Sequence, residues 1–95
     1  MAATAAHPSQ VRFDADETLT WYSPDPTSAT VEYGFCRRCG SSLFWRAAAI
    51  ADQLSICAGT LDQPTGLTTT RAWWVAEAPD YHPRSSGVDE FDYEV

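Results

Sequence analysis

The chain has 95 residues, with 13 acidic and six basic side chains and a formal net charge of −7 at pH 7. This length suits one small domain, and the negative charge argues against nucleic acid as a partner, because phosphate backbones select basic surfaces. No run approaches the roughly 20 apolar residues that cross a bilayer, and the first ten residues do not resemble a secretory signal. We therefore expect a cytoplasmic protein without a membrane partner.

The predicted elements are strands. Residues 1–10 are small and polar, and we expect them to form a flexible N-terminal tail. Alternation of apolar and polar residues then predicts strands over 11–23, 29–36, 41–48 and 53–61. A concentration of β-branched and aromatic residues predicts a further strand over 67–78. Residues 47–52 are predicted as a hairpin connection, and residues 79–95 resemble a loop. About five short strands predict a mainly β, antiparallel fold, with a single domain over 11–95.

The stretch FCRRCGSSLFW contains Cys36 and Cys39, followed at once by Gly40. Between two predicted strands, this spacing predicts a tight turn at a hairpin tip, with both thiols on one side and backbone N–H groups near the sulfurs. Gly40 suits a position of positive φ. The charges of Arg37 and Arg38 are expected to favour the thiolate. Such a pair is typical of a zinc site or of a redox dithiol.

A redox dithiol needs a helix after its first cysteine, whereas a strand is predicted here, so zinc is the favoured interpretation; an inert reduced pair stays open. A structural zinc ion needs four protein ligands. Cys57 on a predicted strand is more typical of a small buried thiol than of a ligand. His7 and His82 lie in segments expected to be solvated. The predicted metal ligands are therefore Cys36 and Cys39.

The motifs GFCRRCGSSLFW, AGTLD, RAWWVAEAPDY and GVDEF follow one another between about Val11 and Phe91. In order and interval they resemble the C-terminal two thirds of the glutathione-dependent formaldehyde-activating enzyme family, which includes centromere protein V. The resemblance implies an Mss4-like fold of twisted antiparallel sheets around zinc, with Cys36 and Cys39 as half of a four-cysteine structural site. It also implies carbon–sulfur lyase activity on a glutathione–formaldehyde adduct, and glutathione or a small thiol adduct as the partner.

The chain departs from this pattern. No cysteine precedes Cys36, so the cysteine-rich N-terminal third is missing, including the ligands of the presumed catalytic zinc. Ala72 stands where relatives often carry histidine. The catalytic residues therefore stay unassigned, and the zinc shell has three open completions: Cys57, the cysteine pair of a second copy, or ligands encoded upstream. The alternative function is a non-catalytic β-module for self-association or partner binding, for which a homodimer is expected.

Overall fold

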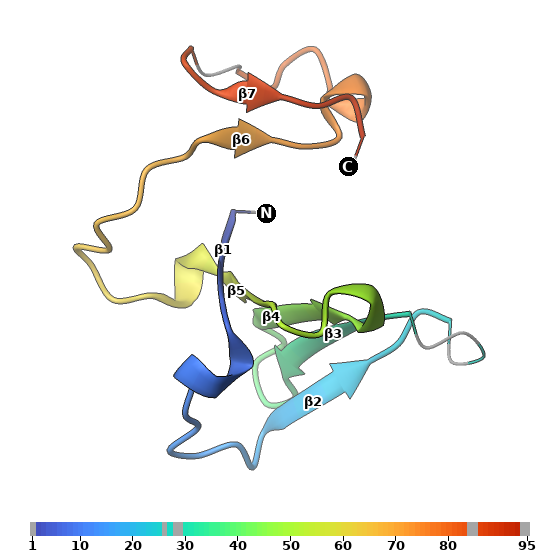
Figure 1. Cartoon of the computed structure of the whole chain (residues 1–95), viewed down its shortest axis with the longest axis vertical. Helices are drawn as coiled ribbons and strands as arrows, with labels where there is room; N and C mark the ends of the chain where they lie inside the picture. The colour runs from blue at the N-terminus through green and yellow to red at the C-terminus, as the bar shows by residue number, and fades with distance from the viewer. Residues whose placement is uncertain (1, 26, 28–29, 84–85, 94–95) are drawn as a thin grey trace. The chain divides into compact units, whose positions relative to one another are not determined.

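The computed structural model describes residues 2–25, 27, 30–83 and 86–93. Contacts divide the chain into two compact units, Met1–Asp62 and Gln63–Val95, which run from blue to yellow and from yellow to red in Figure 1. The single domain that the sequence predicts over residues 11–95 stays a prediction. We describe each unit by itself.

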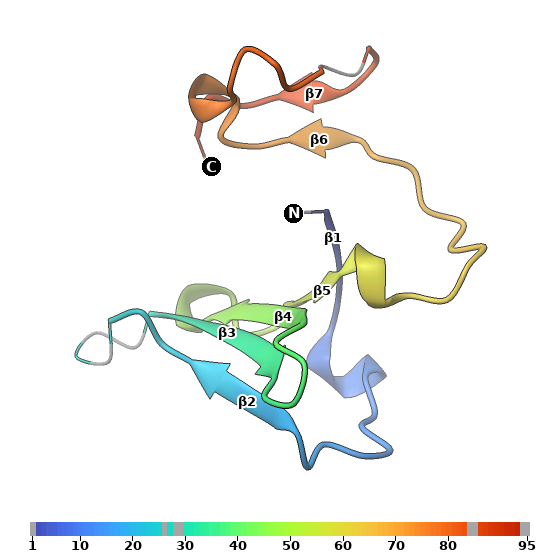
Figure 2. The ribbon, with the colours of Figure 1, turned by 180° about the vertical axis from the view of Figure 1, so that it is seen from behind.

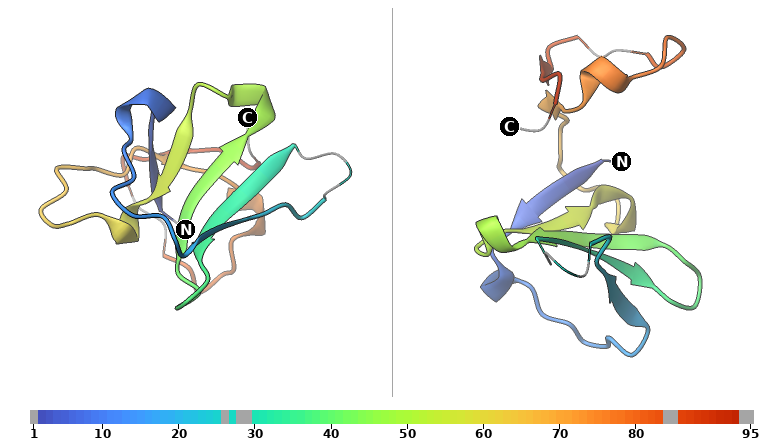
Figure 3. Two further views of the ribbon diagram at one scale, coloured as in Figure 1. Left: turned by 90° about the horizontal axis from the view of Figure 1, so that it is seen from below. Right: turned by 90° about the vertical axis from the view of Figure 1, so that its right-hand side faces the viewer.

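The first unit is built on an antiparallel five-stranded sheet in the order β1-β5-β4-β3-β2 (Figures 1 and 2). Its strands are β1 (Ala3–Ala6), β2 (Leu19–Tyr22), β3 (Val31–Cys36), β4 (Ser42–Ala47) and β5 (Leu54–Cys57). Figure 3 shows these strands fanning across one another, which is the twist common to β-sheets. The predicted mainly β, antiparallel architecture is confirmed, and four of the predicted strands contain β2 to β5.

The expected N-terminal tail is wrong for its first residues. β1 pairs with β5 in a register that runs from Ala3 opposite Cys57 to Ala6 opposite Leu54. The pairing continues beyond the strand, since the Ala58 N–H donates to the Ala2 carbonyl at 2.9 Å. Alanine has a low preference for strands, so the side-chain pattern of this segment gave no strand signal. Its backbone hydrogen bonds form the pairing instead.

Short 3-10 helices occupy several connections of the first unit, namely η1 (Pro8–Gln10), η2 (Ala48–Ile50) and η3 (Ala58–Thr60). The His7 ring caps η1, because its Nδ1 accepts from the Ser9 backbone N–H at 3.1 Å. η2 lies in the connection between β4 and β5, which pair antiparallel with Phe44 opposite Ile56. This is the hairpin connection that the sequence predicts.

One face of the sheet, which we call the Trp21 face, contains a line of paired residues. Trp21 lies opposite Gly34, Gly34 opposite Phe44, and Phe44 opposite Ile56. The Trp21 and Phe44 rings stack with centroids 6.1 Å apart. Phe13, from the segment between η1 and β2, meets Phe44 edge-on at 5.4 Å. This segment therefore packs on the Trp21 face.

The glycine at the centre of this line allows the rings to pack. Gly34 is buried, and a Cβ there would lie 3.1 Å from Cζ3 of Trp21 and 3.2 Å from Cβ of Phe44. Real Cβ atoms rarely come this close to a neighbour, so the Trp21 ring occupies space that only glycine leaves free.

The second unit is less regular. It holds two short parallel strands, β6 (Arg71–Ala72) and β7 (Asp89–Glu90), and the 3-10 helix η4 (Val75–Glu77). The long strand predicted over 67–78 is wrong except at β6. Trp74 has a φ of 61°, a left-handed conformation that bulky residues rarely adopt and that ends extended structure. No helix among the described residues of either unit has the length and hydropathy to cross a membrane.

Candidate metal centre

The Cys36–Cys39 pair lies in the tight turn that joins β3 to β4. The Cys36 N–H donates to the Ser41 carbonyl at 2.9 Å, and the Gly40 N–H donates to the Cys36 carbonyl at 2.7 Å. Gly40 has a φ of 79°, which a side chain would disfavour. The sequence prediction of a hairpin tip with glycine at a positive φ is therefore confirmed.

A residue distant in sequence helps to hold this turn. The Arg37 N–H donates to the Thr18 carbonyl at 2.9 Å, and the Thr18 hydroxyl lies 3.5 Å from the Cys36 sulfur. Cys39 has its own neighbour, with its sulfur 3.1 Å from the Ser41 hydroxyl. Thr18 was not a candidate from the sequence, because only the pairing of β2 with β3 brings it beside the cysteine.

The pKa of Cys36 is lowered from 9.0 to about 7. The largest cause is the hydrogen bond from the Thr18 hydroxyl, followed by the backbone N–H groups of Cys39 and Arg38 and then the Cys39 side chain. Each donor stabilises the thiolate more than the thiol. The backbone N–H groups stabilise the sulfur as the sequence predicts. Hydrogen bonds, and not the charges of Arg37 and Arg38, lower the pKa of Cys36. The turn therefore offers a thiolate near neutral pH.

We expect the alkylation rate of Cys36 in metal-free protein to rise with pH around a midpoint near 7, because the thiolate is the nucleophile. Thr18→Val removes the largest stabilising contact and should move this midpoint upward. Thr20→Val, two residues further along the chain in β2, is the matched control. Trypsin cleaves after Arg37 and Arg38, so mass spectrometry after iodoacetamide pulses distinguishes Cys36 from Cys39. A midpoint near 9 in the unmodified protein would contradict the hydrogen-bond assignment.

The remaining cysteine lies in a different environment. Cys57 ends β5 and is 6% exposed, and burial raises the pKa of its thiol. A neutral, buried thiol is a poor metal ligand. The expected burial of Cys57 is therefore confirmed, and its role as a packing residue stays a prediction.

The described residues bring together two of the predicted metal ligands. Cys36 and Cys39 are adjacent in the turn, whereas His7 caps η1 and the His82 backbone N–H donates to Pro79 within the second unit. Among the described residues, no group of three or more histidine, cysteine or acidic side chains could hold a metal ion. Two thiolates suit zinc chemically, but a structural zinc needs four protein ligands and a catalytic one about three.

Comparison with known proteins gives one finding. A family model described as "Glutathione-dependent formaldehyde-activating enzyme" matches residues 1–77. The matched region contains the whole first unit, including β1 and the cysteine turn, and continues through β6 and η4. No curated protein and no solved structure matches the chain.

Proposed function

Because the chain belongs to the glutathione-dependent formaldehyde-activating enzyme family, we propose that it binds zinc through Cys36 and Cys39 and acts as a carbon–sulfur lyase on a glutathione–formaldehyde adduct. The observation that carries the metal assignment is the β3–β4 turn, where hydrogen bonds hold the pKa of Cys36 at about 7. A thiolate that exists at neutral pH binds zinc with little cost of deprotonation.

The reaction is the reversible addition of a thiol to formaldehyde. The glutathione thiol loses its proton to solvent, its sulfur forms a bond to the carbonyl carbon, the carbonyl π electron pair moves to oxygen, and that oxygen takes a proton; the lyase direction reverses these steps and breaks the same C–S bond. Bound zinc would supply Lewis acidity and a lowered pKa for a bound thiol. Cys36 and Cys39 would hold the ion, and the exposed Arg37 and Arg38 beside them would attract the carboxylates of glutathione.

The second candidate is a non-catalytic module that pairs with another copy of itself. It is supported by the lack of a third potential ligand near the turn among the described residues. Two copies would then contribute four sulfurs to one closed site, which leaves no open position for a substrate. β1 and β2 lie at the two edges of the sheet, where a second chain can add hydrogen bonds.

An assay of formaldehyde consumption separates the two candidates. Under the lyase proposal, zinc-loaded protein speeds the loss of formaldehyde in glutathione at least about tenfold over the spontaneous reaction. The double variant Cys36→Ser/Cys39→Ser with the same total zinc is the control, and it should match the spontaneous rate. If zinc-loaded protein gives no acceleration, the lyase proposal fails and the non-catalytic candidate stands.

A further inference from the structure

A pocket of about 300 Å³ lies on the Trp21 face of the first unit. Its apolar lining includes Val11 and Phe13 from the segment that packs on this face, and Trp21 and Leu54 from the sheet. The lining also contains two charged residues, Glu32 and Arg46. They face each other where β3 begins and β4 ends, at the opposite end of β3 from Cys36. The pocket is therefore separate from the cysteine turn.

The Arg46 guanidinium is held in place from two sides. Its Nε donates to the Glu32 carboxylate at 3.0 Å, and its central carbon lies 3.7 Å from the centre of the Trp21 ring. The ring is itself fixed by stacking on Phe44. Two fixed contacts reduce the entropy that the arginine loses when it takes up a ligand, so the group is preorganised for binding.

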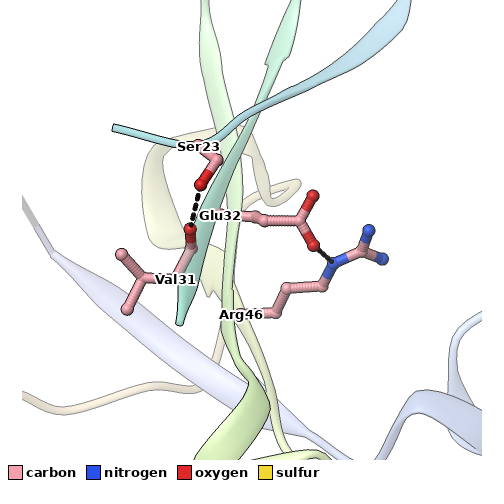
Figure 4. A network of polar contacts seen from close by, with 4 residues as sticks. All are labelled: Ser23, Val31, Glu32 and Arg46. Atoms are coloured by element: carbon pink, nitrogen blue, oxygen red, sulfur yellow. Dashed lines mark hydrogen bonds and ion pairs between the residues drawn. The ribbon is translucent and has the colours of Figure 1, made fainter. Parts of the chain in front are cut away.

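The ion pair uses only part of each side chain. In Figure 4 the dashed line joins Nε of Arg46 to one oxygen of Glu32, and no dashed line reaches the two Nη groups or the second carboxylate oxygen. The Nη groups can receive a carboxylate in bidentate geometry, and the carboxylate oxygen can accept from an ammonium group. A donor set and an acceptor thus lie side by side at an apolar pocket.

The charges of this pair select the class of ligand. Glu32 repels a ligand that carries only a carboxylate, and Arg46 repels a ligand that carries only an ammonium group. A head group with both charges satisfies both residues. A volume near 300 Å³ is at the small end of ligand pockets. We propose that this pocket binds an α-amino acid with an apolar side chain, its carboxylate on Arg46, its ammonium on Glu32 and its side chain against Val11, Phe13 and Leu54.

The same zwitterion occurs in free amino acids and at the γ-glutamyl end of glutathione. The apolar lining favours the free amino acid, since the rest of glutathione is polar. The charged side chains are 46% and 36% exposed, so water and salt weaken their contribution. We therefore expect binding in the millimolar range that decreases with ionic strength.

The test is a titration of metal-free protein with L-phenylalanine, followed by NMR of the Trp21 indole N–H and the Arg46 Nε–H. We expect phenethylamine and 3-phenylpropionate, which each lack one charge, to bind at least about tenfold more weakly. Glutathione should also bind more weakly than phenylalanine. Metal-free protein is used so that the result does not depend on the proposed zinc site.

Variants locate the binding. Arg46→Gln and Glu32→Gln should each weaken phenylalanine binding about tenfold, and Ala51→Phe, which fills the pocket from its lining, should abolish it. Arg12→Gln and Asp14→Asn are the matched controls, because they remove an ion pair of the same 3.0 Å length that is 88% and 82% exposed. No shift of the Trp21 indole at about 20 mM phenylalanine overturns the proposal. Equal binding of either singly charged analogue, or tighter binding of glutathione, also overturns it.

Discussion

Replacement of Cys36 or Cys39 by serine is expected to abolish zinc retention. A hydroxyl is not deprotonated at neutral pH and does not replace a thiolate on zinc, and one remaining sulfur is too few to hold the ion. Elemental analysis of the unmodified protein after gel filtration should give no more than about one zinc per chain, and about half if two chains share a four-sulfur site. Unchanged zinc content in either variant would refute the ligand assignment.

Cys57→Ala is the control for this experiment. Cys57 is buried at the end of β5, so alanine removes a thiol without removing a predicted ligand, and zinc content should stay the same. Native mass spectrometry separates the remaining alternatives. Zinc found only on dimers supports a shared site, whereas zinc on monomers requires a ligand from outside the Cys36–Cys39 turn.

Gly34→Ala is expected to lower the free energy of unfolding by about 1–3 kcal/mol, the usual cost of overpacking. The added methyl group would lie 3.1 Å and 3.2 Å from two atoms of the Trp21 ring and 3.2 Å from Cβ of Phe44. The ring cannot easily move aside, because Arg46 and Phe44 both pack against it. Urea unfolding followed by circular dichroism measures the difference.

The matched control is Gly59→Ala in η3. Apart from its chain neighbours and the backbone of its own helix, no atom lies within 4 Å of the position that its Cβ would take, so the change should have little effect on stability. If both variants unfold at the same urea concentration as the unmodified protein, the packing of Trp21 over Gly34 does not stabilise the sheet as proposed.

The features that were predicted correctly from the sequence are local. Alternation over three to eight residues indicated β2 to β5, and the spacing of Cys36 and Cys39 before Gly40 indicated the turn. These patterns are readable because each depends on neighbouring residues alone. The Mss4-like arrangement and the zinc ligands stay predictions.

The features that were missed depend on pairing between distant segments. β1 consists of small residues, and only its register with β5 makes it a strand. Thr18 is beside Cys36, and Glu32 is beside Arg46, because of the antiparallel pairing of β3 with its two neighbours. The opposite error occurred at Trp74, where strong strand formers surround a residue with a left-handed backbone. Propensity alone did not reveal that break.

The pairing of β1 with β5 has a chemical consequence for the buried thiol. Ala3 lies directly opposite Cys57, so this alanine strand separates the sulfur's own strand from the solvent at that edge. Proteolytic trimming of a few N-terminal residues would leave β5 at the edge of the sheet. Peroxide and disulfide reagents would then have a route to a cysteine that the intact fold shields.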